Sequence, residues 1–160
     1  MRSLTIIVSF AVGLLANAPT LAAYSYSLVG IPSATITNYS AIANSGIVAG
    51  HYGEANQNFT AFTFDGTSYS TFSVPGAWGT FARGINSAGI VVGEYGFNRA
   101  TGEGGAFVSD GNSFDLFSFP GATTTNFSAI ADSGIIAGHY GDANQNFTAF
   151  TFDGTSYSTF

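Results

Sequence analysis

A near-identical internal duplication constrains this chain more than any other feature. Residues 38–72 recur as residues 126–160, 88 positions later, and only four of the 35 aligned pairs differ. The four pairs keep size or polarity: Tyr39/Phe127, Asn44/Asp132, Val48/Ile136 and Glu54/Asp142. A third, more diverged copy lies between them. Repetition at this period predicts small supersecondary units that bury their apolar faces against one another.

Each copy predicts four short antiparallel strands. The expected strands are residues 38–43, 47–52, 59–64 and 68–74, then 81–86, 90–95, 105–109 and 113–119, then 126–131, 135–140, 147–152 and 156–160. Glycines that permit a positive φ and Asp-Gly pairs separate them, as tight hairpins require. A glycine in the middle of each second strand (Gly50, Gly93 or Gly138) predicts a bulge or a close backbone approach. The middle copy is longer between its second and third strands, so residues 96–105 are expected to form a loop.

The predicted fold is all-β, with three tandem four-stranded repeats that resemble the blades of a β-propeller in a partial or open array. The repeats are expected at about residues 33–75, 76–120 and 121–160 of a domain that covers residues 24–160. A β-trefoil is the alternative, because it also has three repeats. The chain could equally be a truncated fragment of a longer repeat protein. Open strand edges predict self-association.

Residues 1–23 have the pattern of a secretory signal peptide. A basic start precedes the apolar run LTIIVSFAVGLL and a stretch of small residues, with cleavage expected after Ala18, Ala22 or Ala23. The apolar run is shorter than the about 20 residues that cross a bilayer. We therefore expect a secreted, extracellular or cell-surface protein, or a periplasmic one, without stable membrane insertion after cleavage.

The charge balance excludes nucleic acid as a partner. After residue 23 the chain carries nine acidic residues, no lysine and only Arg83 and Arg99. Nucleic-acid binding depends on cations that neutralise phosphates. Cysteine is absent, which excludes disulfides and thiolate metal sites.

Several motifs of the middle copy are those of a known repeat. The segment GINSAGIVVG at residues 84–93, followed by AFV at 106–108, Asp110-Gly111 and FPG at 119–121, resembles the extracellular HAF repeat of bacterial exported proteins. The resemblance implies export, bacterial origin and a repeated β architecture, without a well-defined activity. The histidine that names the family is replaced here by Thr60, Gly105 and Thr148.

The motif HYG(E/D)ANQN supplies the candidate ligand-binding residues: His51, Tyr52, Asn56, His139, Tyr140 and Asn144. A carbohydrate or an extracellular protein is the expected partner. The alternative is that both histidines lie on the surface at strand ends. Trp78 either stacks on a sugar or fills the core.

No catalytic residue, metal site or cofactor is predicted. Residues 142–146 begin like a calcium loop, but Phe147 occupies the position where that loop needs glycine. A secreted hydrolase on a propeller scaffold is the alternative function, with Glu54, Glu94 and Asp142 lining a central channel.

Overall fold

The computed structural model describes residues 5–6, 26–27, 30–31, 33–56, 58–144 and 146–160, in two compact units, residues 1–30 and 31–160. In the first unit, β1 (Thr5–Ile6) pairs antiparallel with β2 (Tyr26–Ser27). Apart from Thr5 and Ile6, the expected signal peptide and its cleavage positions lie outside the described residues. The following description concerns the second unit.

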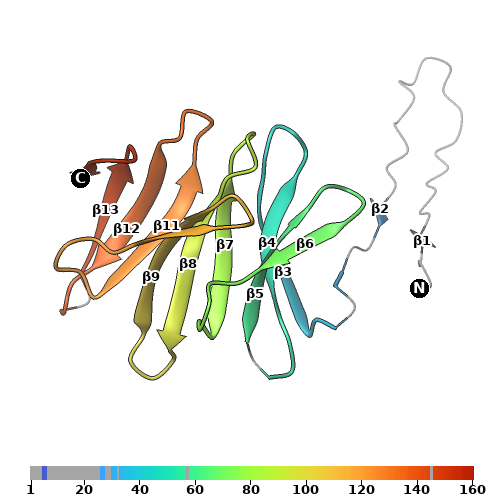
Figure 1. Ribbon diagram of the computed structural model, residues 1–160, viewed down its shortest axis with the longest axis horizontal. Coiled ribbons are helices and arrows are strands. Elements are labelled where there is room, and N and C mark those ends of the chain that lie inside the picture. Colours follow the sequence, from blue (N-terminus) through green and yellow to red (C-terminus); the bar gives the residue numbers. More distant parts are fainter. Residues whose placement is uncertain (1–4, 7–25, 28–29, 32, 57, 145) are drawn as a thin grey trace, which may run out of the picture. The chain divides into compact units, whose positions relative to one another are not determined.

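The second unit is built from three groups of four strands, which we call quartets 1, 2 and 3 (Figure 1). Quartet 1 comprises β3 (Ile36–Ile42), β4 (Val48–Gly53), β5 (Phe59–Phe64) and β6 (Tyr69–Phe72). Quartet 2 comprises β7 (Gly79–Ile85), β8 (Val91–Asn98), β9 (Glu103–Ser109) and β10 (Phe114–Phe117). Quartet 3 comprises β11 (Thr124–Ile130), β12 (Ile136–Gly141), β13 (Phe147–Phe152) and β14 (Tyr157–Thr159). Within each quartet, strands that follow one another in the chain pair antiparallel. The all-β prediction is confirmed, and each predicted strand of residues 38–160 overlaps an observed one.

The quartets lie side by side in chain order (Figure 1). A single parallel bridge, Phe59 with Gly79, joins quartets 1 and 2 into one eight-stranded sheet, and quartet 3 forms a sheet of its own. Among the described strands no sheet closes into a barrel. The β-trefoil alternative is therefore wrong, since that fold requires a closed barrel.

A glycine in each second strand allows the first strand to approach closely. A Cβ atom on Gly50, Gly93 or Gly138 would lie 2.1, 2.0 or 2.3 Å from a carbonyl oxygen of the first strand, which belongs to the residue before the one that pairs with the glycine. The first strand of each quartet shifts register opposite these glycines, between Tyr39/Ala41, Ala82/Gly84 and Phe127/Ala129. The predicted bulge and the predicted close approach are both present.

The inserted segment of quartet 2 is more ordered than expected. β8 continues to Asn98 and β9 begins at Glu103, so only residues 99–102 of the predicted loop lie outside the strands. Gly96 pairs with Gly104, whose Cβ atom would collide with the carbonyl oxygen of Tyr95 at 2.0 Å. The strands can pair that far because glycine has no side chain.

Each quartet has two apolar faces, and the hydrophobic core lies between consecutive quartets. We call the face toward the next quartet the forward face and the face toward the preceding quartet the rear face. In quartet 1 the forward face comprises Ala43, Ile47, Ala49, His51, Phe59 and Ala61, and the rear face comprises Tyr39, Ile42, Val48, Phe62 and Phe64. The forward face of quartet 1 packs on Ala82, Ile85 and Val91 of quartet 2. Val92 and Ala106 of quartet 2 pack in turn on Phe127, Ile136 and Phe152 of quartet 3.

Candidate functional site

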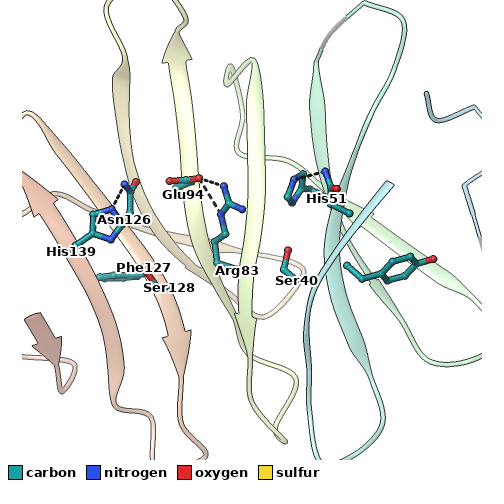
Figure 2. A pocket seen from close by; sticks show the side chains of 10 residues that line it. Ser40, His51, Arg83, Glu94, Asn126, Phe127, Ser128 and His139 are labelled. Carbon is teal, nitrogen blue, oxygen red and sulfur yellow. Dashed lines mark hydrogen bonds and ion pairs between the residues drawn. The ribbon is translucent and has the colours of Figure 1, made fainter. Parts of the chain in front are cut away.

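The first two strands of all three quartets border one cavity of about 640 Å³, which we call the inner cavity (Figure 2). Its lining includes the residue that follows the central glycine of each second strand: His51, Glu94 and His139. It also includes the residue that the register shift leaves unpaired in each first strand: Ser40, Arg83 and Ser128. The remaining lining residues are Asn38, Tyr39, Asn126 and Phe127. The bulge and the glycine opposite it thus bring equivalent positions of the three quartets to one site.

Quartet 1 contributes a histidine–asparagine pair in which the histidine is buried and the asparagine is exposed. Asn38 lies directly opposite His51 in the strand register, and its Nδ2 is 3.2 Å from His51 Nε2. His51 is only 6% exposed, and its ring centroid lies 5.1 Å from that of Phe81. The prediction of a surface histidine is therefore wrong for His51, because quartet 2 covers it.

Burial lowers the pKa of His51 below its ordinary value of 6.5, and the positive charge of Arg83 adds to this effect. The carbonyl of Ala82 and the charge of Glu94 act in the opposite direction. The Nδ1 atom is buried, and no hydrogen bond to it is completed among the described residues. The neutral ring is therefore the form that the fold favours at pH 7.

Quartet 2 contributes an ion pair at the same positions. The guanidinium group of Arg83 donates from both Nε and Nη2 to Glu94 Oε1, with Nε at 3.1 Å. Both side chains remain partly exposed, so solvent screens the pair and it adds little to stability. Its consequence for the cavity is that one positive and one negative charge offset each other.

Quartet 3 repeats the histidine–asparagine pair and extends it to quartet 2. Asn126 lies opposite His139, 3.0 Å from its Nε2. We assign the amide orientation in which the nitrogen of Asn126 donates to Glu94 Oε2 at 2.6 Å and its oxygen accepts from His139 Nε2, because this orientation satisfies both ends. A continuous hydrogen-bonded chain then runs from Arg83 through Glu94 and Asn126 to His139.

Of the six predicted ligand-binding residues, the structure brings only His51 and His139 to the inner cavity. Tyr52 and Tyr140 belong to the opposite, rear side of their strands, and the Tyr140 ring stacks on Phe119 at 3.8 Å. Asn56 and Asn144 lie exposed in the turns that lead to the third strands.

In each of these turns a side-chain oxygen accepts a backbone N–H, from Asn56 in the first turn and from Asp142 in the second. Asn56 Oδ1 accepts the backbone N–H of Asn58 at 2.9 Å. The backbone N–H of Asn144 donates to the carboxylate of Asp142 at 2.8 Å. Neither interaction places the asparagine side chain at the cavity.

Sequence reasoning missed the partners Asn38, Asn126 and Arg83. The signal that could have revealed the two asparagines is the antiparallel register, which sets Asn38 opposite His51 and Asn126 opposite His139, each 13 residues apart. Arg83 could have been found as the cation in the bulge of a strand whose counterparts carry serine.

The three acids of the hydrolase alternative do not gather at one place. Among the described residues that line the inner cavity, Glu94 is the single carboxylate. Glu54 borders a separate hollow beside Phe59 and Trp78. The side chain and backbone of Asn146 hold the pKa of Asp142 below its usual range, as a closed turn does.

Trp78 packs between quartets 1 and 2. Its ring lies edge-on to Phe59 at 6.2 Å and to Phe81 at 5.5 Å, and the guanidinium of Arg99 lies 4.4 Å from its centroid. Within the described ranges, no three histidine or acidic side chains come together as a metal site would need.

Comparisons with models of protein families, with curated proteins and with solved structures found no match. Over the described residues, the structure has no helix that is both long enough and apolar enough to cross a membrane.

Proposed function

We propose that the chain is an exported β-repeat scaffold, that its quartets are propeller-type blades, and that the inner cavity binds a neutral, hydroxyl-rich ligand, namely a carbohydrate. The observation that carries this proposal is the hydrogen-bonded chain from Arg83 to His139, which spans two quartets at the cavity wall. The resemblance to the HAF repeat and the signal-like start of the sequence support the exported location.

The blade interpretation is supported by the strand order. Propeller blades are four-stranded antiparallel sheets arranged around a central channel. Here each quartet pairs in chain order, and the first strands β3, β7 and β11 all border the inner cavity.

The carbohydrate assignment is supported by the chemistry of the lining. Asparagine and serine side chains offer neutral donors and acceptors, and the charges of Arg83 and Glu94 compensate each other. A volume of about 640 Å³ lies within the usual range of small-molecule sites, roughly 300–1,000 Å³.

A glycan array followed by titration calorimetry tests the proposal. We expect Glu94→Gln to weaken binding of the selected glycan by about 10- to 150-fold, since one charge-assisted hydrogen bond contributes about 1.5–3 kcal/mol. Asp115→Asn is the matched control, because it removes one carboxylate from the exposed surface of β10 and should leave affinity unchanged. The proposal fails if no glycan binds, or if both variants bind as the native chain does.

A further inference from the structure

Quartets 1 and 2 are joined at one end of their junction by a backbone bridge and a group of aromatic rings. Phe59 pairs with Gly79 in the parallel bridge, and its N–H donates to the carbonyl of Trp78 at 3.0 Å. The ring centroid of Phe59 lies 5.0 Å from that of Phe81 and 6.0 Å from that of His51. These rings occupy the space between the two quartets at this end.

The same end of the next junction, between quartets 2 and 3, is built differently. In the strand register Gly104 takes the place of Phe59, and Asn126 takes the place of Phe81. The backbone bridge is missing as well, since β9 does not pair with β11 and quartet 3 forms a sheet of its own. The second junction therefore lacks both the rings and the bridge that join the first.

A hollow of about 310 Å³ lies at this place, and we call it the side cavity. The end of β8, the start of β9 and the first residues of β11 line it, together with Trp78. Gly96, Gly104 and Gly105 belong to the lining and have no side chain that could fill it. A Cβ atom on Gly96 would lie 2.7 Å from Trp78 Nε1, so this glycine makes room for the edge of the indole ring. The volume is at the lower end of the usual range for small-molecule sites, roughly 300–1,000 Å³.

The side cavity has hydrogen-bonding groups of its own. Asn98 and Glu103 line it from either side of the β8–β9 loop, and both are exposed. Two further lining residues, Trp78 and Thr124, have buried polar atoms, Nε1 and Oγ1, for which the described residues supply no hydrogen-bond partner. Buried polar atoms in proteins are normally paired with protein atoms or with a bound molecule. The two unsatisfied atoms therefore point to a polar occupant of this cavity.

The side cavity adjoins the inner cavity. Arg83, Glu94 and Asn126 line both of them, so the hydrogen-bonded chain described above is a shared wall (Figure 2). The side chains of Arg83 and Glu94 are 41% and 26% exposed, which leaves this wall accessible to a ligand. A molecule that passes over the ion pair reaches both cavities.

We propose that the side cavity is a second sugar subsite, and that the ligand is therefore an oligosaccharide with one residue in each cavity rather than a monosaccharide. This proposal rests on the carbohydrate function proposed above. Glu103 and Asn98 bind the hydroxyl groups of the second residue. The shared wall, with Glu94 at its centre, contacts the ligand between the two residues.

The fluorescence of Trp78 gives a direct readout of the side cavity. Trp78 is the single tryptophan of the chain, and it lines the side cavity but not the inner cavity. The probes are glucose, mannose and N-acetylglucosamine, their β-linked oligomers of two to six residues, and the glycan that the array selects. Titration calorimetry measures affinity, and acrylamide quenching measures the accessibility of Trp78.

We expect the oligomer to bind at least about tenfold more tightly than its monosaccharide, because the second residue adds a charge-assisted hydrogen bond to Glu103. Only the oligomer should protect Trp78 from acrylamide. Glu103→Gln should weaken binding of the oligomer by about tenfold and leave the affinity of the monosaccharide unchanged. Glu103 lines neither the inner cavity nor the hollow beside Glu54, so this variant assigns the effect to the side cavity.

Asp115→Asn is the matched control, since it removes one carboxylate at another exposed position of quartet 2 and should change neither affinity. Three results would overturn the second subsite: equal affinities for monosaccharide and oligomer, a bound oligomer that leaves the quenching of Trp78 unchanged, or a Glu103→Gln variant that binds the oligomer as tightly as the native chain does. Each of these results leaves the carbohydrate function standing, whereas a chain that binds no glycan at all refutes both proposals.

Discussion

Two threonines accept backbone hydrogen bonds in the connections between quartets, and replacing them tests the fold. Thr80 Oγ1 accepts the backbone N–H of Val74 at 2.9 Å, in the segment that leads from β6 to β7. Thr125 Oγ1 accepts the backbone N–H of Phe119 at 2.8 Å in the next connection. Both threonines are buried, and each N–H belongs to the residue before a proline. Thr→Val keeps the shape of the side chain but removes the acceptor.

The expected loss of stability follows from the backbone N–H that each substitution leaves without an acceptor. A buried N–H that loses its partner costs about 1–3 kcal/mol, so Thr80→Val and Thr125→Val should each lower the free energy of unfolding by that amount. Thr37 occupies the same position in β3, is only half-buried, and accepts no hydrogen bond from the described residues. Thr37→Val should therefore change stability by less than about 0.5 kcal/mol.

Equilibrium urea denaturation measures all three variants, with an unchanged m-value as the check that only stability has changed. The two buried sites lie in different connections, so the double variant should show the sum of the single effects to within about 0.5 kcal/mol. If Thr80→Val costs no more than Thr37→Val, the argument from the connecting hydrogen bonds is wrong.

Three further predictions use the same residues in different surroundings. Ala61→Leu should lower the free energy of unfolding by about 1–3 kcal/mol, because it overpacks the first core, while Ala149→Leu in a monomeric sample should be near neutral. Urea denaturation measures both variants, and equal losses would contradict the difference in burial. Because the pKa of His51 is lowered in the folded state, the unfolded chain binds a proton at higher pH than the folded chain does. The free energy of unfolding should therefore fall as the pH drops below about 6.5, and His51→Gln should flatten this dependence. Melting temperatures measured between pH 5 and pH 8 decide the sign. Asp132 accepts hydrogen bonds from the backbone and hydroxyl of Ser87, so Asp132→Ala should speed amide exchange at Ser87, and an unchanged rate would remove that contact from the solution structure.

Local structure was predictable because its signals lie within a few residues. The Asp-Gly pairs and the glycines that end the first hairpins placed the turns, and Gly46, Gly89 and Gly134 have φ values of 85°, 82° and 88°. Gly50 predicted the close approach of β3, since glycine in a strand weakens it unless space is needed.

The site was predictable only in part, for a geometric reason. Tyr52 follows His51 in the chain, but successive residues of a strand point to opposite faces, so only the histidine lies at the cavity. Asn38 reaches His51 through strand pairing, which a sequence motif does not display. The burial of Ala49 and the exposure of Ala137 could not be read from the chain either, because the two segments are almost the same and only their neighbours differ.

The arrangement of two similar quartets around a dissimilar one has a consequence for how the chain reaches its native state. Adjacent identical modules can exchange strands and become trapped in misassembled forms, a recurrent failure of tandem repeats. Here residues 38–72 and 126–160 are separated by a quartet that carries Phe81, Arg83 and Glu94 in place of Asn38, Ser40 and His51. A strand from an outer quartet that paired with the central quartet would lose its histidine–asparagine contact. The different sequence of the central quartet therefore disfavours non-native strand pairing during folding.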